Sequence, residues 1–306
     1  MLASRAMSAI WANLFTPIGA LLGALAAFTT FYIVYWWSAV TKAKPRESAL
    51  ELGTGFVTNF FDTLGIGSFA PTTAIFKFFR LVPDRLIPGT LNVGHTLPTI
   101  TQAFIYTVAI EVDPWTLIYM IAAAVAGAWL GAGVVASWPK RKIQIGLGVA
   151  LLVLAVLFAW RNISEMTHTA SLVTGGTGQG TLDLQGWRLI VGLAGNFMLG
   201  AFMTLGIGMY APCMIMIGLL GMNAKAAFPI MMGSCAFLMP ISTRQFVKKD
   251  AYSLRPALAL GIGGLPAVLL AALIVKEMDV IYVRWLVIVV VLIAATMLLR
   301  SAAKNE

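Results

Sequence analysis

The chain has 306 residues, of which 59% are hydrophobic and only 11% charged, and its mean hydropathy is +0.88. This composition excludes a water-soluble globular domain and predicts an all-α polytopic protein of the plasma (inner) membrane, surrounded by lipid. The net charge of +9 does not indicate nucleic-acid binding, because the basic residues cluster in short loops, as topology determinants do. The sequence gives no reason to expect a cofactor or a metal ion.

Taken in chain order, the apolar stretches predict seven transmembrane helices. The first sixteen residues lack a compact apolar core with a cleavage site, so we expect a short interfacial helix there rather than a signal peptide. Segments of roughly 20 apolar residues then follow. They cover residues 17–38, 86–110, 115–137, 143–160, 225–247, 254–275 and 281–299.

Two further apolar stretches, 52–80 and 189–220, contain glycines followed by a proline, which interrupt a helix. They carry nearly the same phrase, TLGIGSFAP in the first stretch and TLGIGMYAP in the second. The offset of 141 residues also relates Pro88 to Pro229 and superimposes the later predicted helices of the two halves. The sequence therefore predicts two repeats, each an interrupted hairpin followed by three helices.

The distribution of positive charge indicates whether the interrupted stretches cross the membrane or return. If both are re-entrant, one side receives fifteen of the 21 lysines and arginines and the other side six, whereas two crossings remove this bias. The positive-inside rule thus favours two re-entrant hairpins, an external N-terminus and a cytoplasmic C-terminus. Because three helices follow each hairpin, the two repeats have inverted topology, as in many secondary transporters.

These predictions divide the chain into five segments. The predicted segments are 1–50 (N-terminal segment, first helix and cytoplasmic loop), 51–161 (repeat 1), 162–188 (external linker), 189–302 (repeat 2) and 303–306 (cytoplasmic tail).

The two interruptions predict a site for a small anion. Pro71 and Pro212 suit the first turn of each outgoing half-helix, and two helix N-termini that face one midplane point attract negative charge. We expect further backbone donors at 67–68 and 208–209. In this prediction the free N–H groups after the prolines are those of Thr72, Thr73, Cys213 and Met214.

Polar residues in the helix after the first hairpin are candidates to bind the anion, because polar groups at membrane depth are often functional. Asn92 and Thr96 fit interhelical hydrogen bonding equally well. His95 could contact the anion, carry a proton or be a satisfied core histidine. The matching stretch of the second repeat contains Gly233, Ser234 and Cys235, of which Ser234 has the same two interpretations.

Asp62 stands alone among the 12 acidic residues, since the others fall in loops, near helix ends or in the tail. Its counterpart in the second repeat is Met203. A proton on Asp62 could be coupled to anion movement, and we assign proton coupling to Asp62 and His95. The alternative is that Asp62 caps free N–H groups at the interruption and never titrates.

The phrases LGIGSFAP and LGIGMYAP, each opening one hydrophobic half, resemble the motif of the TauE/SafE family of sulfite exporters. The resemblance extends from about residue 50 to 300 and implies a secondary carrier that exports sulfite or an organosulfonate. Phe69 and Tyr210 replace glycines of the family's usual run and favour an organic sulfonate, whose carbon end could pack on these rings. The motif maps onto Gly65, Gly67, Pro71, Gly206, Gly208 and Pro212.

Together these arguments give one predicted substrate site and two rival functions. An anion channel could use the same site. An intramembrane hydrolase using Ser68 and His95 is a more distant alternative, because Met209 replaces Ser68 in the second repeat while the glycines recur. The predicted substrate-binding residues are Gly65, Gly67, Ser68, Thr72, Asn92, His95, Gly206, Gly208, Tyr210, Cys213 and Ser234.

The sequence leaves the direction of transport, the coupling ion and the oligomeric state open. Gly127 and Gly131 form a face of small residues that could pack helices within one protomer or between the two protomers of a homodimer.

Overall fold

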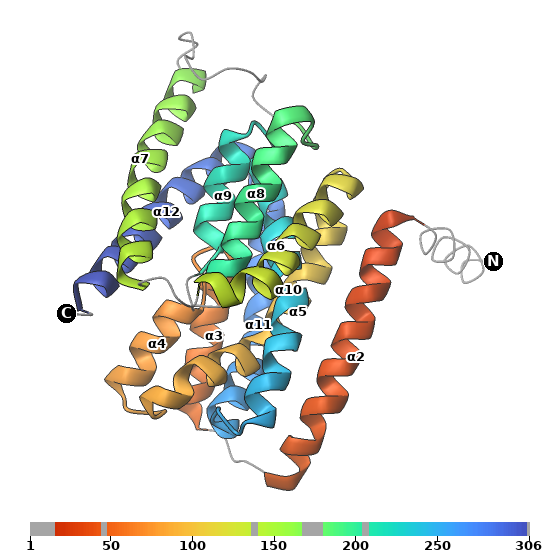
Figure 1. Ribbon diagram of the computed structural model, residues 1–306, viewed down its shortest axis with the longest axis vertical. Helices are drawn as coiled ribbons and strands as arrows, with labels where there is room; N and C mark the ends of the chain where they lie inside the picture. Colours follow the sequence, from red (N-terminus) through yellow and green to blue (C-terminus); the bar gives the residue numbers. More distant parts are fainter. Residues whose placement is uncertain (1–15, 44–47, 136–139, 167–179, 204–207, 305–306) are drawn as a thin grey trace.

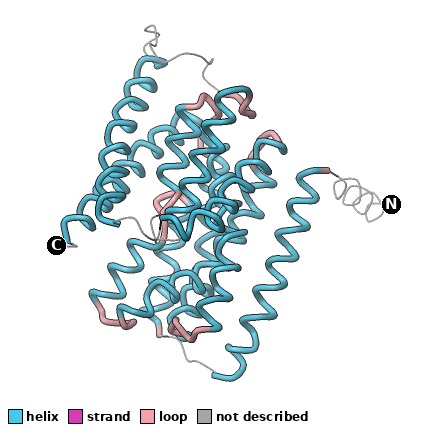
Figure 2. The backbone as a smooth tube through the Cα atoms, viewed as in Figure 1, coloured by secondary structure: helices cyan, strands magenta, loops and turns pink. Residues whose placement is uncertain are grey.

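The computed structural model describes residues 16–43, 48–135, 140–166, 180–203 and 208–304 (Figure 1). These residues form helices and connecting loops, and their only strand-like feature is an isolated bridge between Thr181 and Met222 (Figure 2). The helices are α2 (Pro17–Ala43), α3 (Ala49–Thr63), α4 (Phe69–Phe78), η1 (Asp84–Leu86), α5 (Ile87–Ala109), α6 (Pro114–Val135), α7 (Lys140–Met166), α8 (Gly186–Met203), α9 (Tyr210–Leu219), η2 (Ala224–Ala226), α10 (Ala227–Lys248), α11 (Leu254–Glu277) and α12 (Val280–Lys304).

Six helices within the described ranges are long and apolar enough to cross a membrane, so the chain is an all-α, multi-pass membrane protein. Five of them coincide with predicted spans, and the sixth, Gly186–Met203, belongs to the second interrupted stretch. α5 and α6 fill the two remaining predicted spans. Neither is among the six: α5 is lined with buried polar side chains, and α6 includes a shorter apolar segment, Pro114–Leu130.

Two ends of the molecule can be identified from contacts between loops. At the lower end in Figure 1, the backbone N–H of Ser253 donates to Thr90 Oγ1 over 2.9 Å, which joins the start of α11 to the start of α5. At the upper end, the N–H of Asp113 donates to the carbonyl of Leu182 over 2.8 Å. The segment 49–78 starts and finishes at the lower end, and the segment 186–219 starts and finishes at the upper end.

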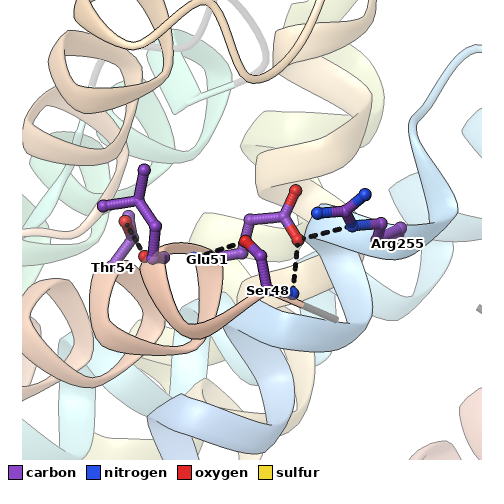
Figure 3. A network of polar contacts seen from close by, with 5 residues as sticks. Ser48, Glu51, Thr54 and Arg255 are labelled. Atoms are coloured by element: carbon purple, nitrogen blue, oxygen red, sulfur yellow. Dashed lines mark hydrogen bonds and ion pairs between the residues drawn. The ribbon is translucent and has the colours of Figure 1, made fainter. Parts of the chain in front are cut away.

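An ion pair fixes the lower end of α3 to that of α11 (Figure 3). The buried carboxylate of Glu51 accepts from Arg255 Nε over 2.8 Å and from the backbone N–H of Ser48 over 3.1 Å. The Ser48 hydroxyl in turn accepts from the N–H of Glu51, which completes a capping box at the start of α3.

The principal helix pairs are α3 with α11, α6 with α8, α5 with α10 and α7 with α12. In the first two pairs the backbones approach closely at glycines. A Cβ on Gly55 would lie 2.8 Å from the Cα of Leu260, and a Cβ on Gly200 would overlap the carbonyl oxygen of Ala124. Close approach of this kind is typical of helix packing within membranes.

The helices of the two halves also correspond at the sequence offset of 141. α4 and α9 have ten residues each, and their bounds are exactly one offset apart. The bounds of α6 and α11 agree to within one residue at each end under the same offset. α2 has no counterpart and packs mainly on α10. The expected interfacial helix at 1–16 falls almost wholly outside the described residues, and α7 continues to Met166, beyond the predicted start of the linker.

Candidate functional site

Side chains from α3, α4, α5 and α9 form one buried group of polar residues around the first interruption, which we call the polar cluster. Each of its members is buried, although the surrounding helices are largely apolar. A buried polar group is costly unless it is hydrogen-bonded, so the partners of these side chains are informative. The polar cluster consists of Asn59, Asp62, Thr63, Ser68, Thr72, His95, Gln102, Tyr106 and Tyr210.

The first interruption begins where α3 ends in a Schellman motif. The N–H of Gly65 donates to the carbonyl of Asp62, and the N–H of Ile66 donates to that of Phe61. Gly65 has φ +94° and Gly67 has φ +88°, in the left-handed region that favours glycine. A Cβ on Gly65 would lie 2.5 Å from Met214 Sδ of α9, whereas the space beside Gly67 is open. The glycine repeat therefore turns the chain and lets α9 approach it.

Each proline lies in the first turn of its half-helix, as predicted, but the N–H groups of Thr72 and Cys213 after the prolines are not free. α4 begins at Phe69 and α9 at Tyr210, so each proline is the third residue of its helix. The N–H of Thr72 already donates to the carbonyl of Ser68, and the N–H of Cys213 donates to that of Met209. Proline is tolerated anywhere in the first turn because that turn lacks intrahelical acceptors for its N–H groups. The N–H groups that lack an intrahelical acceptor are those of the first two residues of each helix, 69–70 and 210–211.

Asp62 is surrounded by hydrogen-bond donors. Gln102 Nε2 donates to Asp62 Oδ2 over 3.0 Å, and the hydroxyl and backbone N–H of Ser68 also lie against the carboxylate. Among the described residues, no lysine or arginine contacts Asp62. The carboxylate therefore occupies the N-terminal end of α4, where we expected the substrate anion.

Gln102 connects the first interruption to the second half of the chain. Its Nε2 also donates to Thr63 Oγ1 over 2.9 Å, and its Oε1 accepts from the hydroxyl of Tyr210 over 3.4 Å. Tyr210 is the first residue of α9, directly after the second interruption. The hydroxyl of Tyr106 donates to the Thr63 carbonyl over 3.1 Å, which fixes the end of α3 to α5.

His95 has partners for both ring nitrogens. Nδ1 lies 2.9 Å from Asn59 Oδ1, and Nε2 lies 3.1 Å from Thr72 Oγ1. Because an amide oxygen can only accept, Nδ1 of a neutral ring carries the proton and Nε2 accepts from the Thr72 hydroxyl. Neither nitrogen contacts Ser68, so the serine and histidine of the hydrolase hypothesis are not paired as nucleophile and base.

Other predicted site residues lie outside the polar cluster. Asn92 Oδ1 accepts from the hydroxyl of Thr243, between α5 and α10. Ser234 Oγ accepts from Asn196 Nδ2 over 3.3 Å, between α10 and α8. Asn92 and Ser234 thus form hydrogen bonds between helices, which the sequence analysis gave as the alternative to binding the anion. Cys213 is buried in the apolar core, Gly208 is exposed, and Gly206 lies outside the described residues.

Sequence reasoning missed Asn59, Gln102 and Tyr106. Gln102 follows His95 by seven residues, which is two helical turns, so both side chains lie on one face of α5. Tyr106 is one further turn along the same face. Continuing the polar stripe beyond His95 would have identified both residues.

No family model, no curated protein and no solved structure matches the chain.

Proposed function

We propose that this protein is a secondary transporter of small sulfur-containing anions, either sulfite or an organosulfonate, and that it works as an exporter. In this proposal the anion binds near the membrane midplane, between two interrupted segments that enter from opposite faces. Such sites, built from discontinuous helices of inverted repeats, are typical of secondary transporters.

The contact between the two interruptions is the main support for the proposal. Tyr210, at the start of α9, bonds Gln102, which bonds Asp62 at the end of α3. Met214 of α9 lies against Gly65. Non-helical backbone at membrane depth needs burial in protein or a watery cavity, and the start of α9 helps to bury the first interruption.

The arrangement of the loops supports the inverted topology. The segment 49–78 returns to the lower end and 186–219 returns to the upper end, so each behaves as a hairpin within the molecule (Figure 1). If the lower end is cytoplasmic, the basic residues of the loops between α4 and α5 and between α10 and α11 are on the cytoplasmic side, in agreement with the positive-inside rule.

The choice of substrate rests on the resemblance to the TauE/SafE family, together with two aromatic residues. The ring of Phe69 lies 5.9 Å from that of His95, and Tyr210 borders the polar cluster. The two rings therefore begin α4 and α9, next to the N–H groups that have no intrahelical acceptor. Because Asp62 occupies the end of α4, an organosulfonate could place its oxygens at the N–H groups that begin α9 and its carbon chain against the rings.

Flux measurements in proteoliposomes test the proposal. We expect uptake of sulfite or of a taurine-derived sulfonate that saturates with concentration and is accelerated by unlabelled substrate on the opposite side. Gly67→Ala should reduce this flux at least tenfold, because the left-handed backbone at residue 67 is strained by any side chain. Gly53→Ala is the matched control, since its Cβ meets nothing within 4 Å and Gly53 is in a regular helix.

Other outcomes would favour the rival functions. A flux that does not saturate and is not accelerated by substrate on the opposite side would favour an anion channel. No flux of any sulfur oxyanion, together with a hydrolytic activity abolished by Ser68→Ala, would favour the hydrolase.

A further inference from the structure

The surroundings of Asp62 identify a coupling ion and the route by which it acts. We infer that the transporter is coupled to a proton carried by Asp62, and that Gln102 transmits the charge state of Asp62 to Tyr210 on α9. This inference rests on the proposed function, since it specifies what drives the transport. Gln102 is in this account a positioning residue, because it acts through its two neighbours.

The donors around Asp62 favour a proton over a metal cation. A sodium ion would need several oxygen ligands directed at one point. Asp62 is instead contacted by an amide N–H of Gln102 and by the hydroxyl and N–H of Ser68, all of which direct positive ends at the carboxylate. A proton needs no such set of ligands, since the O–H that it creates can donate to the hydroxyl oxygen of Ser68, and it removes the charge of a carboxylate that is 2% exposed.

The orientation of the Gln102 amide is fixed by its neighbours. The hydroxyl of Thr63 donates to the carbonyl of Asn59 over 2.7 Å, so Thr63 Oγ1 can only accept from Gln102 Nε2. With Asp62 ionised, both hydrogens of Nε2 are used, one on each acceptor. The amide oxygen must then face the other way, toward the donating hydroxyl of Tyr210.

Protonation of Asp62 changes the bond that holds this amide. A hydrogen bond to a carboxylate is roughly twice as strong as one to a neutral carboxyl group. When Asp62 takes a proton, Gln102 loses that charge-assisted partner and its hold on Tyr210 weakens. The start of α9 is then less firmly attached to the first interruption. Protonation of Asp62 therefore changes the contact that the second half of the chain makes with the first half.

Four other titratable side chains must be separated from Asp62 in any pH experiment. Tyr106 on α5, Tyr210 on α9 and Cys235 on α10 face the carboxylate. Tyrosine and cysteine ordinarily titrate above pH 8. His95 on α5 ordinarily titrates near pH 6.5, but its nitrogens bond Asn59 and Thr72 rather than Asp62.

Flux at several pH values gives the first test. In proteoliposomes with an imposed proton gradient, we expect the gradient to accelerate wild-type flux at least tenfold over the flux of the same protein without a gradient. Asp62→Asn should abolish this acceleration, and Gln102→Leu should reduce it to less than threefold, each relative to the variant's own flux without a gradient. Acceleration that survives in Asp62→Asn would assign the proton to another group, such as His95. Acceleration by a sodium gradient at constant pH would also overturn the inference.

Thermal unfolding in detergent gives a second test that needs no transport. Tyr210→Phe removes the hydroxyl that bonds Gln102, and we expect it to lower the melting temperature by about 3 °C more at pH 8 than at pH 5. Adding Asp62→Asn should remove this difference between the two pH values. Tyr106→Phe is the matched control, because Tyr106 bonds the Thr63 carbonyl and its effect should not vary with pH.

The two tests fail separately. If Tyr210→Phe has the same effect at both pH values, the link through Gln102 is refuted even if the protein transports anions. If the pH-dependent link is present but no anion moves, the proposed function fails while the connection between Asp62 and Tyr210 stands.

Discussion

Glu51 shows how a single charged residue is accommodated at the end of a membrane helix. Its side chain is 5% exposed, while that of its partner Arg255 is 51% exposed. The pair therefore lies at a boundary, where the carboxylate loses most of its water and the guanidinium keeps half. The bond to Ser48 satisfies the carboxylate from within its own helix. Glu51 thus takes part both in the helix cap at Ser48 and in the ion pair with Arg255, which lies in the second half of the chain.

We expect Arg255→Met to destabilise the protein by about 1–2 kcal/mol, because it leaves a buried carboxylate with one donor fewer. Because Arg255 is half exposed, we expect this loss of stability to be at the low end of the range for breaking a buried ion pair. The measurement is the melting temperature in detergent. Lys77→Met is the control, since Lys77 and Asp84 form a 3.6 Å pair that is mostly exposed on both sides. Equal changes in melting temperature for the two variants would mean that the ion pair with Arg255 does not stabilise the buried Glu51.

At the scale of elements, the contact between α3 and α11 depends on a side chain being absent. Gly55 faces the backbone of α11, and Gly53 is two residues earlier on the same helix with open space beside it. The two positions share helix propensity and membrane depth, and differ only in what their Cβ atoms would meet. They therefore separate the cost of close packing from the general effect of alanine in a helix.

We expect Gly55→Ala to destabilise the protein by about 1–3 kcal/mol, because α3 and α11 must separate to admit the methyl group. Gly53→Ala should be neutral or slightly stabilising, since alanine has the higher helix propensity. Chemical denaturation in mixed micelles would measure both changes. A similar change in stability for both variants would show that α3 and α11 leave room for a methyl group at Gly55.

Elements were easier to predict from the sequence than the site. The offset of 141 residues placed α4 and α9 correctly because a repeated phrase fixes the same backbone geometry twice. The prolines lie in the first turns as predicted, but the free N–H groups were assigned to the residues after them, because proline fits several first-turn positions. Gln102 was missed because its importance comes from Asp62 and Tyr210, which meet it only through tertiary packing.

At the scale of the whole molecule, the ends of the segments make a prediction about sidedness. Residues 49 and 84 lie at the lower end, and residues 111 and 185 lie at the upper end; all four are exposed. The native thiols Cys213 and Cys235 are buried, so they should contribute little to labelling by a membrane-impermeant reagent.

We expect Ala49→Cys and Asp84→Cys to react from one side of the membrane, and Glu111→Cys and Gln185→Cys from the other. Labelling of intact cells, followed by labelling after permeabilisation, distinguishes the two groups. Reaction of residues 49 and 84 from opposite sides would mean that 49–78 crosses the membrane, and the inverted architecture would then fail.

The proposed topology rests on two features at this scale, the charge bias of the sequence and the contacts between loops. It is also the topology that lipid favours, since backbone without internal hydrogen bonds is excluded from lipid. The sequence also shows that the two halves are not equivalent. The second half repeats the glycines and the proline, but Met203 and Met209 stand where the first half has Asp62 and Ser68.

This inequality has a consequence for the energetics of transport. One carboxylate stands at the two interruptions, so a cycle driven through it carries one proton. For a proton to drive export, it must enter as the anion leaves. Each cycle then moves two positive charges inward when the cargo is a singly charged sulfonate, and three when it is a doubly charged sulfite ion. Current recordings on reconstituted protein would therefore reveal the valence of the natural cargo.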